Sequence, residues 1–342
     1  MLTYTIRRLI FTIPVLLFIS LIIFLLLDMA PNDPTGNLPL TIPPEVREKI
    51  RISLGLGEPV YWRYLLWCKQ FFINEPLNII DQVFNVCTWG CEDRLRVTSW
   101  ATRSPVVDLI VQRMPQTLWV VGMSYVVGII IALPIGVISA YKQYSWFDQA
   151  GTFVSMVGFS VPPFFSGVLL IVVFSVMIPS DSFFWLPSIY DTTLEVVNWD
   201  SFMMQVRQMI MPVMVLALQT TAQISRFMRA SMLDNLNQDY VRTARAKGMK
   251  ESVVLLGHVL RNSLIPVVTV IALGIPSVFG GAIITEQVFK VNGIGQLLII
   301  GIQGADIPLV QTLTFIFAVL IVFFNLIADI LYGILDPRIR YD

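Results

Sequence analysis

The chain has 342 residues, of which 56% are hydrophobic and only 13% are charged, and its 23 Lys and Arg residues balance 23 Asp and Glu residues. Soluble domains are nearer half apolar and a quarter charged, so this composition predicts an integral membrane protein and excludes a soluble one. The formal net charge of zero leaves no basic excess for a polyanion, so we expect no nucleic-acid partner.

The first apolar run, Leu9–Leu27, follows Arg7 and Arg8. A cleaved signal peptide is the alternative, because basic residues precede an apolar core. The run of about 19 residues is long for that role and is enough to cross a hydrocarbon core of about 30 Å. The sequence "DMAPNDP" after it lacks a clean small-x-small cleavage site. We therefore predict an uncleaved transmembrane helix.

Five further apolar segments complete a predicted set of six transmembrane helices. A backbone that faces lipid must satisfy its own hydrogen bonds, so each is expected to be helical, and the fold class is an all-α integral membrane protein. The fourth is the weakest, because it carries glutamines and threonines. The segments are Thr117–Ala140, Gly151–Ile178, Met209–Ser225, Leu264–Ile284 and Leu309–Leu335.

The distribution of Lys and Arg predicts the orientation of these helices. The two termini with residues 141–149 and 226–263 make about 62 residues carrying 12 Lys and Arg, whereas the opposite side has 11 in about 143 residues. Because Lys and Arg crowd cytoplasmic loops, we expect both termini in the cytoplasm. This divides the chain into a first helix (1–27), an extracytoplasmic insert (28–116) and a transmembrane core (117–342) with a cytoplasmic loop (226–263).

The insert holds all three cysteines, Cys68, Cys87 and Cys91. In an oxidising compartment Cys87 and Cys91 are a candidate disulfide that leaves Cys68 free. Plain thiols are an equally open alternative, and a metal site lacks His or acidic ligands to complete it. The sequence "PPEVREKIRISLGL" predicts a short surface helix in the insert.

Three tryptophans of the insert, Trp62, Trp67 and Trp89, are predicted either at the membrane interface or in a small extracellular core. We favour ordinary packing in a loop region over a ligand-binding cluster.

Motifs for catalysis are absent from the sequence. The only histidine is His258, and there is no H-E-x-x-H or G-x-x-x-x-G-K-[ST] motif, so neither a zinc protease nor an ATP-binding P-loop is expected. We predict no catalytic, cofactor or metal site, and no enzyme. Asp329 is the one acid well inside an apolar run. We expect it to pair with a polar group on a neighbouring helix or to lie near the headgroups, since one carboxylate makes no proton relay.

A polar, basic segment, Tyr240–Val267, lies between two apolar runs and predicts two helices joined at a glycine. Asp239 suits the N-cap of the first helix. Tyr240, Val241 and Ala244 share one face, and Arg242 and Arg245 take another. Gly248 suits the left-handed residue that ends a helix.

The second helix of this segment is expected to start near Glu251, with an apolar stripe of Val253, Leu256 and Leu260. The residues alone leave two interpretations open for the pair of helices. It docks in a groove of a soluble partner, or it rests as an amphipathic helix on anionic lipid.

The same segment resembles the coupling loop of permeases from binding-protein-dependent ABC importers, in the form typical of oligopeptide, dipeptide and nickel systems. It carries "RTARAKG" at Arg242–Gly248 and the pattern H-x-L-R-N-x-L-x-P at His258–Pro266. Further matches run along nearly the whole chain, although the segment 83–100 does not fit the family pattern. They are "APNDP" (30–34), "LGLGEPVYWRYLLW" (54–67), "RMPQTLWV" (113–120), "GGAIITEQVF" (280–289), "GIGQLL" (293–298) and "DPRIRY" (336–341).

The resemblance implies a type I ABC importer permease fold in a bacterial inner membrane. It implies a second homologous permease, two cytoplasmic ATPases and an extracytoplasmic substrate-binding protein as partners, beside membrane lipid. The implied function is ATP-driven import of peptides or related small solutes, coupled to the ATPases through the 240–266 loop. The implied coupling residues are Tyr240, Arg242, Ala244, Arg245 and Gly248. A stand-alone channel or secondary carrier, or a membrane scaffold, is the alternative.

The path for the solute is expected along the polar or small face of the spans. Gln219 and Gln223 are four residues apart on one helix face and Thr220 lies beside them, so these three are candidates to line it. The alternative is that they bond to neighbouring helices.

Two spans are expected to be interrupted, and one acidic residue remains to be placed. Pro162-Pro163 is expected to kink or break the third span, and Pro276 with Gly280-Gly281 to loosen the fifth. Glu286, just past the fifth span, is expected to be a surface carboxylate, with a place in the outer mouth as the alternative.

Overall fold

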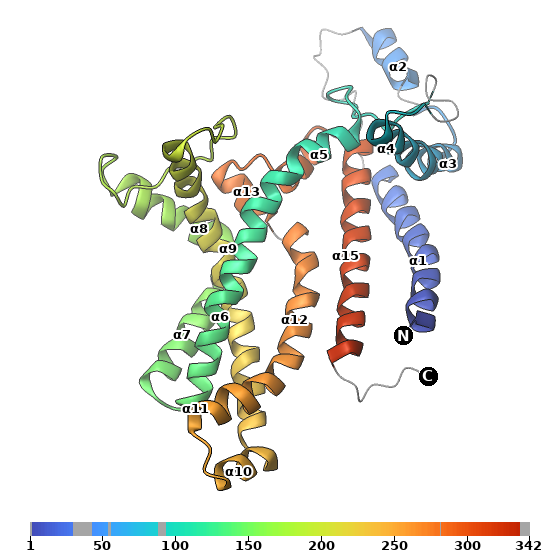
Figure 1. The fold of residues 1–342 in the computed structure, drawn as a ribbon. Coiled ribbons are helices and arrows are strands. Elements are labelled where there is room, and N and C mark those ends of the chain that lie inside the picture. The colour runs from blue at the N-terminus through green and yellow to red at the C-terminus, as the bar shows by residue number, and fades with distance from the viewer. Residues whose placement is uncertain (1, 30–42, 54–55, 88–93, 281, 336–342) are drawn as a thin grey trace. The chain divides into compact units, whose positions relative to one another are not determined.

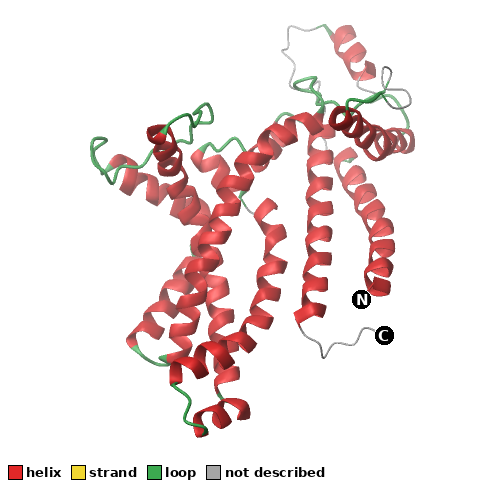
Figure 2. Ribbon diagram, viewed as in Figure 1, coloured by secondary structure: helices red, strands yellow, loops and turns green. Residues whose placement is uncertain are grey.

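A computed structural model describes residues 2–29, 43–53, 56–87, 94–280 and 282–335. This part of the chain is helical and contains no strand beyond one isolated antiparallel bridge between Thr98 and Pro105 (Figures 1 and 2). It forms two compact units. The first comprises Met1–Arg8, Gln116–Gln296 and Leu320–Asp342, and the second comprises Leu9–Pro115 and Leu297–Val319.

The first unit is built on α6 (Met123–Tyr141) and α9 (Trp199–Leu236), which pack along much of their lengths. Small residues allow this approach: a Cβ on Gly136 would lie 2.5 Å from the Met228 Cβ atom, and one on Gly128 would lie 2.8 Å from the Thr220 Cβ atom. Close backbones held by small residues are how helices associate in lipid, where the hydrophobic effect does not drive them together. Helix α12 (Leu260–Gly280) also packs on α9.

The third predicted span is broken, as expected. Helix α7 (Trp146–Ser160) and helix α8 (Pro163–Ile171), which continues as a π-helical turn over Val172–Val176, meet at 102°. Val161 is extended because the residue before a proline is excluded from helical geometry, and Pro163 then takes the first helical position of α8.

A second bent pair follows the fifth span. Helix α12 ends at Gly280, and α13 (Ile283–Phe289) and α14 (Ile294–Gln303) then meet at 89°. Lys290, with φ of 57°, is the left-handed residue that ends α13. The span expected to loosen at Pro276 and Gly280-Gly281 stays helical through Pro276 and ends at Gly280, while Gly281 itself lies outside the described residues.

One end of the first unit carries α10 (Asp239–Ala246) and α11 (Glu251–Val253), which leads through a π-helical turn (Val254–Val259) into α12 (Figure 1). Buried residues of this hairpin share a core with Ala140 at the end of α6. A second core holds Leu186, Tyr190 and Phe289 together with Met211 of α9. The segments predicted on one side of the membrane thus gather in one core, and those predicted on the other side gather in another.

The second unit gathers the insert helices with parts of the first and last helices. They are α1 (Leu2–Asp28), α2 (Pro44–Ser53), α3 (Val60–Lys69), α4 (Glu75–Phe84), α5 (Val106–Thr117) and α15 (Ile307–Leu335). A π-helical turn, Gln70–Asn74, joins α3 to α4. Helix α2 confirms the short helix predicted in the insert.

Aromatic side chains form the core of the second unit. Trp67 is 5% exposed; its ring stacks on Phe71 at 5.3 Å between centroids and meets Phe315 edge-on at 5.7 Å. Trp67 therefore confirms the predicted small core. Trp62 is exposed, and Trp89 lies outside the described residues.

An ion-pair network supports this core. The Arg96 guanidinium donates to the carboxylates of Glu75 and Asp108, each with a shortest contact of 2.9 Å, and Glu75 is almost fully buried. A buried carboxylate needs such a partner, because an unpaired charge out of water is costly.

Five helical stretches of the described chain are long and apolar enough to cross a membrane, and the two bent pairs bring the total to as many as seven. Five of the six predicted spans overlap these stretches, and the third overlaps the bent pair α7–α8; the predicted Leu264–Ile284 runs past the end of its stretch at Ile275. The predicted Met209–Ser225 was too short, because it is the middle of the 38-residue α9. At 1.5 Å per residue α9 is about 57 Å long, so it extends beyond a hydrocarbon core of about 30 Å.

Candidate functional site

The helical hairpin of α10 and α11 has one buried face and one exposed face. Val241 is fully buried and Ala244 is nearly so, whereas Arg242 and Arg245 are exposed. Tyr240 is on the exposed side, where its hydroxyl donates to the Asn235 side-chain oxygen at 2.8 Å. The predicted apolar face is confirmed for Val241 and Ala244, and the two arginines point away from the core.

Gly248 ends the first helix of the hairpin with φ of 74°, as predicted. Its N–H donates to the Arg245 carbonyl at 2.9 Å, which closes the last turn of α10. A Cβ added there would meet nothing within 4 Å, so only the positive φ requires glycine.

The two arginines differ in how firmly they are held. Arg245 donates to the Glu251 carboxylate across the Gly248 turn, at 2.6 and 3.2 Å, and this hydrogen bonding raises the pKa of Arg245. Arg242 lies 3.6 Å from Asp239, and both side chains are largely exposed. Arg245 therefore braces the two helices of the hairpin, whereas Arg242 remains available at the surface.

Two details of the hairpin were predicted wrongly. Asp239 is the first residue of α10, and the N-cap is Gln238 without a side-chain hydrogen bond. The apolar stripe is wrong for two of its three residues: Val253 and Leu256 are exposed, whereas Leu260 packs on the core, and the fully buried residues are Val254 and Val259. The π-helical turn at Val254–Val259 places the buried Val254 and Val259 five residues apart, a spacing that a regular 3.6-residue period does not predict.

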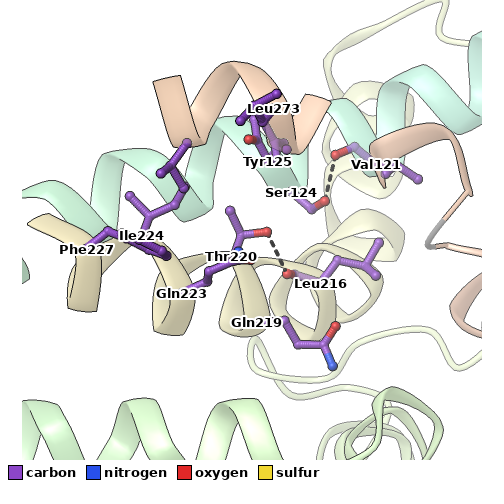
Figure 3. Close-up of a pocket in the computed structure, with 12 residues that line it drawn as sticks. Val121, Ser124, Tyr125, Leu216, Gln219, Thr220, Gln223, Ile224, Phe227 and Leu273 are labelled. Atoms are coloured by element: carbon purple, nitrogen blue, oxygen red, sulfur yellow. Dashed lines mark hydrogen bonds between the residues drawn. The ribbon is translucent and has the colours of Figure 1, made fainter. Parts of the chain in front are cut away.

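A cavity of about 520 Å³ lies among α6, α9 and α12 of the first unit (Figure 3). The predicted residues Gln219, Thr220 and Gln223 all line it. The other lining residues are apolar or carry a hydroxyl: Val121, Ser124, Tyr125, Leu216, Ile224, Phe227, Val270, Leu273 and Gly274.

Most polar groups of this cavity are already bonded. The Ser124 hydroxyl donates to the Val121 carbonyl at 2.6 Å, and the Thr220 hydroxyl donates to the Leu216 carbonyl at 3.2 Å (Figure 3). The Tyr125 hydroxyl donates to the Ile271 carbonyl of α12. Thr221, next to Thr220, also bonds between helices, because its hydroxyl donates to the Gly128 carbonyl at 3.2 Å.

The fold and these two sites can be set beside known proteins. Residues 132–341 match the family described as the inner membrane component of binding-protein-dependent transport systems, and residues 1–121 match its N-terminal region. The chain is 38% identical to the oligopeptide transport system permease protein AppB of Bacillus subtilis (strain 168). It is 35% identical to the glutathione transport system permease protein GsiC of Escherichia coli (strain K12). Both alignments cover 100% of this chain and 100% of the relative.

The chain belongs to this family of permeases. It is therefore a multi-pass inner-membrane protein and the permease subunit of an ABC importer, a transport component and not an enzyme. Permeases of this family serve importers that also use ATPase and substrate-binding components. A solved amino acid ABC transporter aligns with 68% of the chain and 95% of its own length, at 13% identity and a TM-score of 0.46.

Glu286 of the permease is buried, so the predicted surface carboxylate is wrong. The side chain is 1% exposed; its carboxylate accepts from the Thr117 hydroxyl at 2.8 Å and from the Gln296 N–H at 2.9 Å. The Thr117 oxygen in turn accepts from the Ile294 N–H at 2.8 Å. These contacts satisfy N–H groups in the first turn of α14, which have no partner within their own helix.

Sequence reasoning missed this network, although Gly293 and Gly295 hint at it. A Cβ on Gly293 would overlap the Glu286 carboxylate, and one on Gly295 would lie 2.8 Å from the Ile283 Cα atom. Two glycines separated by one residue at the start of a helix indicate that another group approaches the backbone closely there.

The structure also bears on the predictions for the cysteines and for Asp329. Cys68 is a free thiol, and Cys87 is in a disulfide, whereas Cys91 lies outside the described residues. The pairing of Cys87 with Cys91 therefore stays a prediction. Asp329 forms an ion pair with Arg8, which confirms the expected pairing, although the partner is charged.

Proposed function

We propose that the permease imports peptides, as one of two homologous permeases driven by two cytoplasmic ATPases and supplied by an extracytoplasmic binding protein. The observation that carries the coupling part is the hairpin α10–α11. Val241 and Ala244 of α10 are buried in a core with residues of α6 and α9, while Tyr240, Arg242 and Arg245 lie on the outside of a turn fixed by Gly248. A hairpin packed this way transmits a push from a partner to the spans, since a rigid contact is what coupling requires.

The proposed orientation puts both termini and this hairpin in the cytoplasm. The density of Lys and Arg supports it. So does the packing, because the hairpin shares a core with Ala140 beside the loop 141–149, and the loop residues Leu186 and Tyr190 join the other core. The insert 28–116 is then extracytoplasmic, where the Cys87 disulfide is stable.

Peptide as the substrate class rests on the relatives and on the cavity. AppB is named for oligopeptides and GsiC for glutathione, which is itself a peptide. The cavity with Gln219, Thr220 and Gln223 is the proposed part of the path, since it lies between three spans and presents amide side chains.

Reconstitution tests this proposal directly. Liposomes would contain the permease, its homologous partner and the ATPases, with ATP trapped inside and binding protein plus radiolabelled tripeptide outside. We expect uptake only when ATP, ATPases and binding protein are all present. Uptake by the permease alone would show instead that it is a stand-alone carrier. Complexes that hydrolyse ATP but move no peptide would overturn the proposed substrate class.

A cysteine at Lys247, in a background without native cysteines, tests the orientation. A membrane-impermeant maleimide should label Lys247→Cys in inverted vesicles and not in right-side-out vesicles. The opposite pattern would place the hairpin outside the cell and exclude its coupling role.

A further inference from the structure

The cavity among α6, α9 and α12 has no residue in its lining that carries a charge at neutral pH. Its twelve lining residues include no Asp, Glu, Lys, Arg or His (Figure 3). On α9 residues 208–225 are uncharged, and Arg226, which directly precedes the lining residue Phe227, does not itself line the cavity. A charged solute group in this cavity therefore meets no fixed opposite charge from the lining.

Two side chains supply the free hydrogen-bond donors of the cavity. The hydroxyls of Ser124, Tyr125 and Thr220 are bonded to backbone carbonyls. Gln219 and Gln223 make no side-chain hydrogen bond to any residue of the described chain, and Gln223 is exposed. Each amide offers two N–H donors and a carbonyl acceptor.

The spacing of these two amides suits an extended chain of amide groups. Residues four apart on a helix have Cβ atoms about 5–6 Å apart, and an extended peptide advances about 3.3–3.6 Å per residue. The pair therefore reaches backbone amides one or two residues apart, donating to a carbonyl and accepting from an N–H.

The wall opposite the glutamines is fixed. The Tyr125 hydroxyl bonds the Ile271 carbonyl, and a Cβ on Gly274 would overlap that hydroxyl. Helices α6 and α12 are thus held in close contact at Tyr125 and Gly274. The glutamine side chains on α9 are therefore the polar groups that can reorient to hydrogen-bond a solute.

We propose that this cavity is the part of the path in which the permease recognises the peptide backbone. Gln219 and Gln223 hydrogen-bond the backbone amides, and the uncharged lining does not distinguish positive from negative peptide side chains. The inference rests on the proposed peptide import and adds which feature of the peptide the permease reads. Choice among side chains is then left to the binding protein.

Charge insertion tests the proposal. In the reconstituted importer, uptake is measured for three tripeptides, Ala-Ala-Ala, Ala-Lys-Ala and Ala-Glu-Ala, with one binding protein throughout. Each variant is compared with the wild type by its ratio of Ala-Lys-Ala to Ala-Glu-Ala uptake, so the preference of the binding protein cancels. We expect Gln223→Glu to raise this ratio and Gln223→Lys to lower it, each by about tenfold, which is about 1.4 kcal/mol.

Matched variants separate an effect of charge inside the cavity from an effect of charge elsewhere on the permease. Gln303, which is exposed on α14 and outside the cavity, receives the same changes, and Gln303→Glu and Gln303→Lys should leave the ratio unchanged. Gln219→Leu with Gln223→Leu should lower uptake of all three peptides by a common factor. Membrane insertion of every variant is checked by its copurification with the partner permease.

The outcomes distinguish this inference from the function on which it rests. If the wild type moves the peptides and the Gln223 variants keep the wild-type ratio, the cavity is not on the path and the inference alone fails. If Gln303 variants shift the ratio equally, the effect is long-range and the inference also fails. If the wild type moves none of the peptides in the presence of ATP, the peptide assignment fails and the inference with it.

Discussion

The Thr117 hydroxyl donates to the buried Glu286 carboxylate at 2.8 Å, although 169 residues separate them in the sequence. The same oxygen accepts the Ile294 N–H, so one hydroxyl serves both the carboxylate and the first turn of α14. Thr117→Val would remove both bonds while keeping the shape of the side chain. Because it leaves a buried carboxylate and an N–H short of partners, we expect a loss of about 1–3 kcal/mol in stability.

Thermal unfolding of the purified permease in detergent measures this loss as a lower midpoint. Thr117→Ser is the control, since it keeps the hydroxyl. Equal midpoints for the valine and serine variants would show that the Glu286 network contributes nothing.

The fit of Gly293 against Glu286 gives a second prediction. In Gly293→Ala the new Cβ overlaps the Glu286 carboxylate, which Thr117 and Gln296 hold in place. We expect destabilisation of about 1–3 kcal/mol, the usual cost of forcing atoms into a filled site. Gly122→Ala is the matched control, because a Cβ there meets nothing within 4 Å. The midpoint should fall for the first variant alone.

The Glu286 network shows what a single sequence predicts and what it leaves out. The break at Pro162-Pro163 and the positive φ of Gly248 follow from the residue's own backbone chemistry, and both were predicted. The burial of Glu286 depends on Thr117, which is distant in the sequence, so no local pattern indicates it.

The hairpin was predicted only in part, because its buried face also depends on contacts that a local pattern does not indicate. Its arginines and Gly248 are where the local pattern places them, but the buried residues of its second helix are Val254 and Val259. These residues lie in a π-helical turn, and a search for a 3.6-residue period passes over such a turn.

Gly248 should be the most sensitive position of the hairpin. Gly248→Ala requires a side chain at φ of 74°, which costs about 1–2 kcal/mol and favours a different turn. We expect ATP-dependent uptake to fall several-fold while membrane insertion stays normal. Gly248→Asn should retain more activity, since asparagine tolerates this conformation. Gly257→Ala is the control in the same hairpin, where a Cβ meets nothing within 4 Å; a loss there as large as at Gly248 would show that the positive φ is not what matters.

The two arginines of the hairpin should respond differently to charge exchange. Arg245→Glu places two carboxylates together across the turn, and we expect reduced uptake. The double variant Arg245→Glu with Glu251→Arg restores an opposite pair at the same place and should recover most of the uptake. The pair is exposed, so it contributes at most about 1 kcal/mol to stability, and the readout is uptake. Failure of the double variant to recover would mean that Arg245 contacts the ATPase itself.

Arg242 is the arginine that we expect to meet the ATPase. It lies 3.6 Å from Asp239 and both are exposed, so a partner's carboxylate competes readily for it. Arg242→Glu should lower uptake and also the copurification of the ATPase with the permease, whereas Arg242→Lys should keep both. Normal copurification of the glutamate variant would remove Arg242 from the interface.

Cys68 offers a test by pH. Burial raises the pKa of this thiol, so less of it is the reactive thiolate at neutral pH than for an exposed cysteine. In a variant with Cys87→Ser and Cys91→Ser, we expect slow labelling by a maleimide at pH 7 and a rate that is still rising above the ordinary cysteine pKa of about 8.5. The same variant unfolded in detergent should label quickly and level off near that ordinary value. A folded protein with the unfolded profile would show that the aromatic core around Trp67 does not shield α3.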